Sequence, residues 1–241
     1  MQTIKHFSKN LYHTVHLTTP VAIILAAIIL GSSHVVYGLL GNSGSDSSVV
    51  LFKGRTIDTT DLAIGNTKSD VVVLEYADTE CYYCGQLHPT ITQIKEEYKE
   101  KVGFVYRYFP LTEIHPQAFN EAKAIYCVGK TLGADKREDY INEIFTYKLA
   151  KKNMVLPEGG KESLAKNVGV NETQFKACMS EQATADAIST SREDGIGAGV
   201  EGTPATFVLV KTRKGYEVVS KIDGARPYEY VKAAIEEALS R

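Results

Sequence analysis

The alternation of hydrophobic and polar positions predicts an α/β domain after residue 49. Residues 71–76 form an apolar, β-branched run of strand length, which suits a sheet covered on both faces. Residues 88–99 carry apolar side chains at helical spacing, and a second strand-like run follows at 103–109. This order predicts a βαβ unit.

A block of helices is predicted next. Asn171 precedes the last of them and is of a residue type that caps helix N-termini. The four helical patterns lie at 116–129, 136–149, 161–168 and 172–179.

The C-terminal part returns to strands. Residues 205–211 and 216–222 flank a turn and predict an antiparallel hairpin, and 227–239 predict a closing amphipathic helix. The whole order indicates an α/β fold with a central mixed sheet flanked by helices. An all-helical insertion at about 112–199 interrupts this fold.

A different pattern precedes the domain. No Lys, Arg, Asp or Glu lies between Lys9 and Asp46, and about 20 apolar residues span the roughly 30 Å hydrocarbon core of a bilayer. We therefore expect a transmembrane signal-anchor at 18–40. Lys5 and Lys9 place residues 1–17 in the cytoplasm and the domain on the extracytoplasmic face of the cell membrane.

The alternative for this segment is a cleaved signal peptide with its apolar region at 21–30, which sends the domain to the same side. Residues 41–48, rich in Gly and Ser, predict a flexible linker to the domain at 49–241.

Composition adds limits. A chain of 241 residues with 44% hydrophobic residues can bury one sizeable core. Its net charge of −2 and its lack of a Lys/Arg-rich run give no argument for a nucleic-acid partner, and none is expected. The four cysteines allow two disulfides outside the cytosol.

The candidate chemistry is the motif Cys81-Tyr82-Tyr83-Cys84, between the first strand and its helix. Cysteines three residues apart on a first helical turn have Cα atoms about 5 to 6 Å apart, within disulfide range. A helix N-terminus stabilises an anion, so we expect Cys81 to be the acidic, exposed sulfur and Cys84 to be shielded.

A CxxC motif has two other possible uses, a zinc site and a purely structural disulfide. A zinc site needs two more ligands, and Cys127 and Cys178 form no second CxxC, so no metal is expected. A purely structural disulfide across so small a loop contributes about 2 kcal/mol, against about 4 for one joining Cys127 to Cys178. We therefore expect a disulfide between Cys81 and Cys84 to be reduced more easily than one between Cys127 and Cys178.

From about residue 71 onward the chain resembles the DsbA-like branch of the thioredoxin superfamily. The resemblance rests on the CxxC and on three further motifs: Leu74-Glu75-Tyr76-Ala77-Asp78, Arg107-Tyr108-Phe109-Pro110-Leu111 with His115-Pro116, and Gly202-Thr203-Pro204. It implies a thioredoxin fold and a bacterial protein thiol:disulfide oxidoreductase that needs no cofactor. Tyr82 and Tyr83 differ from the dipeptides of thioredoxin and DsbA, and we expect them to modulate the redox potential.

The resemblance also implies residue roles. Pro204 would be a cis-proline facing the disulfide, and Thr203 would pair with an extended substrate peptide; the alternative is a trans-proline turn, since only about 5% of X–Pro bonds are cis. Glu75 resembles a buried acid that relays protons to the second cysteine; the alternative is a surface glutamate at a strand end. His88, one turn after Cys84, is a possible modulator or a half-exposed helix residue. His115 was expected to cap a helix outside the site.

The resemblance implies a structural disulfide between Cys127 and Cys178; the alternative is two buried free thiols. As an oxidase, a monomer of this kind introduces disulfides into exported proteins. The resemblance implies that it is reoxidised by a quinone-linked membrane partner of the DsbB or vitamin-K-epoxide-reductase type. The alternatives are a reductase or isomerase on the same fold, and a peptide-binding, chaperone-like module with idle cysteines.

Overall fold

The computed structural model describes residues 49–241. The predicted cytoplasmic segment 1–17, the signal-anchor 18–40 and the linker 41–48 lie outside the described residues. Among residues 49–241, every helix is too short or too polar to span a bilayer.

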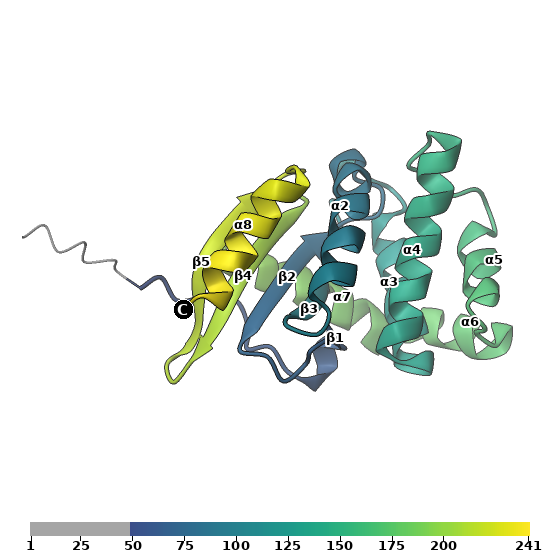
Figure 1. The fold of residues 1–241 in the computed structure, drawn as a ribbon. Coiled ribbons are helices and arrows are strands. Elements are labelled where there is room, and N and C mark those ends of the chain that lie inside the picture. Colours follow the sequence, from purple (N-terminus) through teal and green to yellow (C-terminus); the bar gives the residue numbers. More distant parts are fainter. Residues whose placement is uncertain (1–48) are drawn as a thin grey trace, which may run out of the picture. The chain divides into compact units, whose positions relative to one another are not determined.

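The core of the domain is a mixed five-stranded sheet in the order β1-β3-β2-β4-β5 (Figure 1). Only β2 and β3 pair in parallel, and every residue of these two strands is buried. The strands are β1 (Ile64–Gly65), β2 (Val71–Ala77), β3 (Gly103–Tyr108), β4 (Ala205–Thr212) and β5 (Gly215–Asp223). The predicted α/β fold with a mixed sheet is confirmed; β1 and the 3-10 helix η1 (Thr59–Asp61) are too short to show a periodic pattern and were not predicted.

Helices cover both faces of the sheet. On one face, α2 (Tyr82–Tyr98) and α8 (Tyr228–Leu239) lie side by side, as Figure 1 shows, and pack Ile94 and Ile235 into the same cluster as Val73. The other face meets α7 (Gln182–Gly197) at Gly195, where a Cβ would lie only 2.6 Å from the ring of Phe109. Glycine at this position lets the helix approach the sheet closely.

The helical insertion between β3 and β4 contains five helices. Asn171 caps one of them as predicted, its side chain accepting from the Gln174 amide at 3.1 Å. The helices are α3 (Ala118–Leu132), α4 (Ala134–Lys151), α5 (Gly160–Asn167), α6 (Glu172–Ser180) and α7. We had not predicted α7, because its buried positions are Thr184, Ile188, Ser191 and Gly195. They have helical spacing but include one large apolar residue, so hydrophobic periodicity does not reveal the helix.

A disulfide joins the insertion internally. Cys127 of α3 and Cys178 of α6 are bonded, with Cα atoms 5.8 Å apart and a separation of 51 positions in sequence. Closing a loop of this length restricts the unfolded chain and stabilises the fold by about 4 kcal/mol.

Candidate active site

The CxxC motif lies where β2 passes into α2. The helix begins at Tyr82, before the periodic stretch 88–99, and Cys81 occupies its N-cap position with extended backbone, as expected for a cysteine at the helix N-terminus. Cys84 is in the first turn, and its sulfur accepts from the Asp78 amide at 3.5 Å. Both cysteines are free thiols.

The segment Thr203–Pro204, which lies before β4, contacts the CxxC motif at Cys81. Its peptide bond is cis, and the Cys81 thiol donates to the Thr203 carbonyl at 3.2 Å. The fold thus brings together two segments 122 residues apart in sequence.

The exposure of Cys81 differs from our expectation. Its relative exposure is 5%, against 1% for Cys84, so both sulfurs are sheltered and the prediction of an exposed Cys81 was wrong. The contact with the Thr203 loop explains this cover. The exposed groups are Tyr82 at 59% and Tyr83 at 61%, with their rings edge to face at 5.6 Å.

The two thiols have opposite acidities. The hydrogen bond from the Cys84 thiol lowers the pKa of Cys81 to about 6, against the effect of burial and with help from the Thr203 side chain and the backbone N–H groups of Cys84 and Tyr83. Burial, and then the interaction with Cys81, raise the pKa of Cys84 well above its ordinary value. At neutral pH the reduced pair therefore holds its negative charge on Cys81.

This asymmetry predicts the pH dependence of alkylation. In the reduced protein, the iodoacetamide rate at Cys81 should rise with pH to half its maximum near pH 6, because the thiolate is the reactive form. An unperturbed cysteine has its midpoint near about 8.5. Mass spectrometry of the labelled peptides should find Cys84 unmodified across this range, and a Cys81 midpoint near 8 would contradict the assignment.

Glu75 lies on β2, one position from the strand's buried Leu74, and is itself 9% exposed. Burial raises the pKa of its carboxyl to about 7, an effect that the charge of Lys95 partly offsets. Glu75 also raises the pKa of Cys84 through its charge. It is a buried acid and does not lie on the surface.

The two histidines lie differently from each other. His88 stacks on Phe145 of α4, with ring centroids 4.5 Å apart, and burial lowers its pKa to about 4, so it is neutral at pH 7. His115 was expected outside the site, yet its Nδ1 lies 2.7 Å from the carboxylate of Asp78. Asp78 begins the loop that leads to Cys81, so His115 belongs to the surroundings of the site.

A buried ion pair under this loop was missed by the sequence reasoning. Lys148 of α4 and Glu121 of α3 are both 0% exposed, with Nζ and Oε2 2.5 Å apart. Lys148 also donates to the Thr79 carbonyl at 3.0 Å, and the Thr79 hydroxyl donates to Glu121. The only sequence signal is that Lys148 continues the buried face of α4 set by Ile141 and Ile144.

No metal site accompanies the cysteines in the part of the chain that the structure describes: residues 49–241 hold no group of three or more His, Cys, Asp or Glu side chains that could bind an ion.

Comparison with curated proteins finds parts of longer chains. A Na+/H+ antiporter, NhaA 3 of Salinispora tropica, is 28% identical over 151 residues, which are 63% of this chain and 22% of the antiporter. The chain therefore spans less than a quarter of that relative. A Rickettsia conorii protein, named provisionally as a protein-disulfide oxidoreductase, is 26% identical over 159 residues, 63% of this chain and 54% of that protein.

The fold has close counterparts among solved structures. The thiol-disulfide exchange protein α-DsbA2 from Wolbachia pipientis superposes with a TM-score of 0.62 at 20% identity, covering 75% of this chain and 88% of that one. The thioredoxin family model matches residues 58–237, about three quarters of the chain. The chain thus belongs to the thioredoxin family and has the fold of the DsbA-like thiol-disulfide exchange proteins.

Proposed function

We propose that the chain is an extracytoplasmic thiol:disulfide oxidoreductase that introduces disulfides into exported proteins through Cys81 and Cys84. The observation that carries the proposal is the acidity of the Cys81 thiol beside the cis Thr203–Pro204 segment, next to a Cys84 thiol of raised pKa. A stabilised thiolate stabilises the reduced form of the pair, and this makes the oxidised form a stronger oxidant.

The exchange proceeds in two displacements. A substrate thiolate attacks the Cys81 sulfur of the oxidised pair, the Cys81–Cys84 bond breaks, and Cys84 leaves and takes up a proton. A second substrate thiolate then attacks the first substrate sulfur, and Cys81 leaves as a stable thiolate. Two electrons pass from the substrate dithiol to the cysteine pair, and a quinone-linked membrane partner would remove them.

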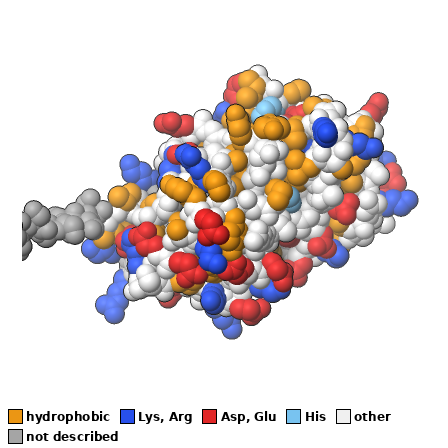
Figure 2. All heavy atoms as spheres, turned by 45° about the horizontal axis from the view of Figure 1, so that its top comes forward, with side chains coloured by type: hydrophobic (Ala, Val, Ile, Leu, Met, Phe, Trp, Pro, Cys, Tyr) orange, Lys and Arg blue, Asp and Glu red, His pale blue; other side chains and the backbone are white. Residues whose placement is uncertain are grey.

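The surface around the motif suits an unfolded protein segment. Tyr82 and Tyr83 expose apolar rings with hydroxyl groups directly beside Cys81. In Figure 2, which brings the top of Figure 1 forward, several hydrophobic side chains are exposed among polar ones over the middle and upper part of the view. In the proposal, the Thr203 backbone pairs with an extended substrate peptide and Pro204 holds that backbone against Cys81.

Glu75 is proposed as the proton donor to Cys84. A carboxyl with a pKa of about 7 holds a proton about half of the time at neutral pH and lies on the strand that leads to the cysteines. Glu75→Gln should slow the step that releases Cys84 by about 10- to 100-fold, as loss of a general acid does. Stopped-flow measurement should show a weakened pH dependence near 7; an unchanged rate and pH profile would exclude the role.

Residues 1–48 are proposed to anchor the domain, with 18–40 as the membrane segment and 49–241 as one monomeric domain. The internal Cys127–Cys178 disulfide supports an oxidising compartment. Native protein should remain with membranes after a high-salt wash, and protease added to the outside should remove the domain. Recovery of a soluble form that begins near residues 33–42 would show cleavage instead.

Paired assays test the direction of electron flow. The oxidised protein should restore activity to reduced, unfolded ribonuclease, and should reduce insulin slowly. The reduction potential of the pair should lie above thioredoxin's roughly −270 mV, towards DsbA's roughly −120 mV, both being values of those proteins. A potential below about −250 mV with fast insulin reduction would favour a reductase. Inactivity in both assays would favour a peptide-binding module.

A further inference from the structure

A cavity of about 230 Å³ lies apart from the cysteines, where the insertion meets the sheet. Residues of η1, β3, α3, α4 and α7 contribute to its lining. Its polar lining includes Arg55, Asp61, Arg107, Tyr126, Arg137 and Ser191. A single water needs only about 10 to 15 Å³ measured in the same way, so a larger polar molecule fits.

Arg137 is the unusual member of this lining. Its relative exposure is 2%, and its guanidinium donates to the backbone carbonyls of Asp61 at 2.8 Å and Leu62 at 2.7 Å and lies near the Tyr108 side chain. Its Nε has no hydrogen-bond partner, and no carboxylate of residues 49–241 lies within 4.0 Å. A buried charge without a counter-ion is costly, so this arginine lacks the partner that buried arginines usually have.

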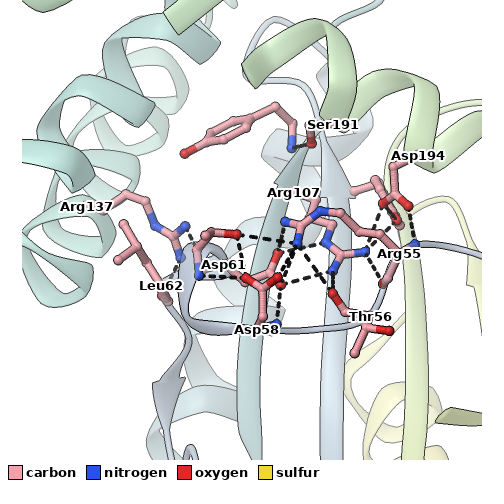
Figure 3. A network of polar contacts seen from close by, with 12 residues as sticks. Arg55, Thr56, Asp58, Asp61, Leu62, Arg107, Arg137, Ser191 and Asp194 are labelled. Atoms are coloured by element: carbon pink, nitrogen blue, oxygen red, sulfur yellow. Dashed lines mark hydrogen bonds and ion pairs between the residues drawn. The ribbon is translucent and has the colours of Figure 1, made fainter. Parts of the chain in front are cut away.

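The other charged groups of the lining do not supply that partner. Arg107 is held between Asp61 at 2.8 Å and Asp194 at 2.9 Å, and Asp61 also bonds Arg55 at 2.5 Å. In Figure 3 Arg137 reaches the Asp61–Leu62 backbone from its own helix, on the side away from Asp194. Three guanidinium groups and one carboxylate thus line the cavity, and the carboxylate is already shared by two of them.

Hydroxyl groups complete a lining rich in donors. The Ser191 hydroxyl oxygen accepts from the Tyr108 amide at 2.9 Å. The Ser191 O–H is therefore available to donate to a ligand. Tyr126 and Tyr108 also line the cavity, and a phenol can donate. Arg55 and Arg107 already pair with Asp58, Asp61 and Asp194, so the positive charge left for a ligand is the unpaired guanidinium of Arg137. A guanidinium without a carboxylate, together with several hydroxyl donors, is chemistry that binds an oxyanion.

We propose that this cavity binds a small oxyanion, of the phosphate, sulfate or short carboxylate class, with Arg137 as its main contact. The bound anion neutralises the unpaired guanidinium and joins the insertion to the sheet through groups of α3, α4, α7 and β3. A site of this kind stabilises the folded chain in proportion to its occupancy.

Isothermal titration calorimetry of the full chain in detergent tests the proposal, with phosphate, sulfate and acetate in separate arms at constant ionic strength. We expect saturable binding in at least one arm, weakened at least tenfold by Arg137→Met. Tyr126→Phe, which removes only a hydroxyl group, should weaken anion binding about threefold. If Arg137→Met does not fold, the affinity of Tyr126→Phe decides the test. Lys176→Met removes one exposed positive charge elsewhere and should leave the affinity unchanged.

Three outcomes would overturn the proposal. The first is the absence of saturable heat in all three arms up to the highest anion concentration that the constant ionic strength allows, which would mean that the cavity holds water only. The second is equal affinity in the wild type and in the Tyr126→Phe and Arg137→Met variants. The third is equal weakening by Lys176→Met, which would assign the effect to net charge.

Discussion

Cys81→Ser should abolish all thiol–disulfide exchange, whereas Cys84→Ala should leave a protein that attacks disulfides but cannot resolve them. Cys81 holds the thiolate because its pKa is about 6, so roughly nine tenths of it is ionised at pH 7, against about 3% for a free cysteine. Cys84 is deeper, at 1% exposure, and burial raises its pKa, so it cannot replace Cys81. Non-reducing gel electrophoresis of cells that express Cys84→Ala should show mixed disulfides with client proteins.

The double variant Cys81→Ser/Cys84→Ala is the control, and it should trap nothing. Both single variants keep the Cys127–Cys178 disulfide, so far-ultraviolet circular dichroism should match the wild type. Client complexes trapped by Cys81→Ser in place of Cys84→Ala would reverse the assignment of the attacking cysteine.

The strands and most helices of this domain could be predicted from the sequence because their burial follows their residue types. The run at 71–76 is apolar except for Glu75, and β2 is buried along its length. Helix α7 escaped prediction because small and polar residues such as Thr184 and Ser191 form its buried side. The start of α2 at Tyr82 agrees with the first helical turn that the CxxC motif predicts, although Pro89 lies within the helix.

The site could be predicted only as far as neighbours in sequence and recurring motifs extend. The CxxC spacing predicts that Cys81 and Cys84 lie close together. No comparable spacing indicates that Lys148 donates to the Thr79 carbonyl 69 residues earlier. The cover of Cys81 by Thr203 likewise depends on a contact across 122 residues. Such contacts follow from how α3, α4 and the β4 entry pack on the sheet, and local patterns do not encode them.

The largest expected effect on stability comes from Lys148. Lys148→Met leaves Glu121 buried without its cation and leaves the Thr79 carbonyl without a donor. Breaking one side of a buried ion pair costs about 3–5 kcal/mol, so the free energy of unfolding in urea should fall by that amount. Lys130→Met, which removes the exposed partner of Glu181, is the matched control and should change it by less than about 1 kcal/mol.

The pH dependence of the stability of Lys148→Met shows whether the loss comes from the unpaired charge of Glu121 or from lost packing. In Lys148→Met the buried Glu121 carboxyl should have a folded-state pKa raised above its ordinary 4.5, since burial already raises its pKa in the wild type. A raised folded pKa favours the folded state below the unfolded value, and that advantage is lost as pH rises through the folded pKa. The loss in free energy of unfolding caused by Lys148→Met should therefore be smaller at pH 4 than at pH 7.

Adding Glu121→Leu to this variant should restore most of the lost free energy at pH 7, because replacing both partners of a buried pair by apolar groups is often neutral. A deficit that is equal at both pH values and persists in the double variant would mean that Lys148 contributes by packing, without a charge role beneath Thr79 and Cys81.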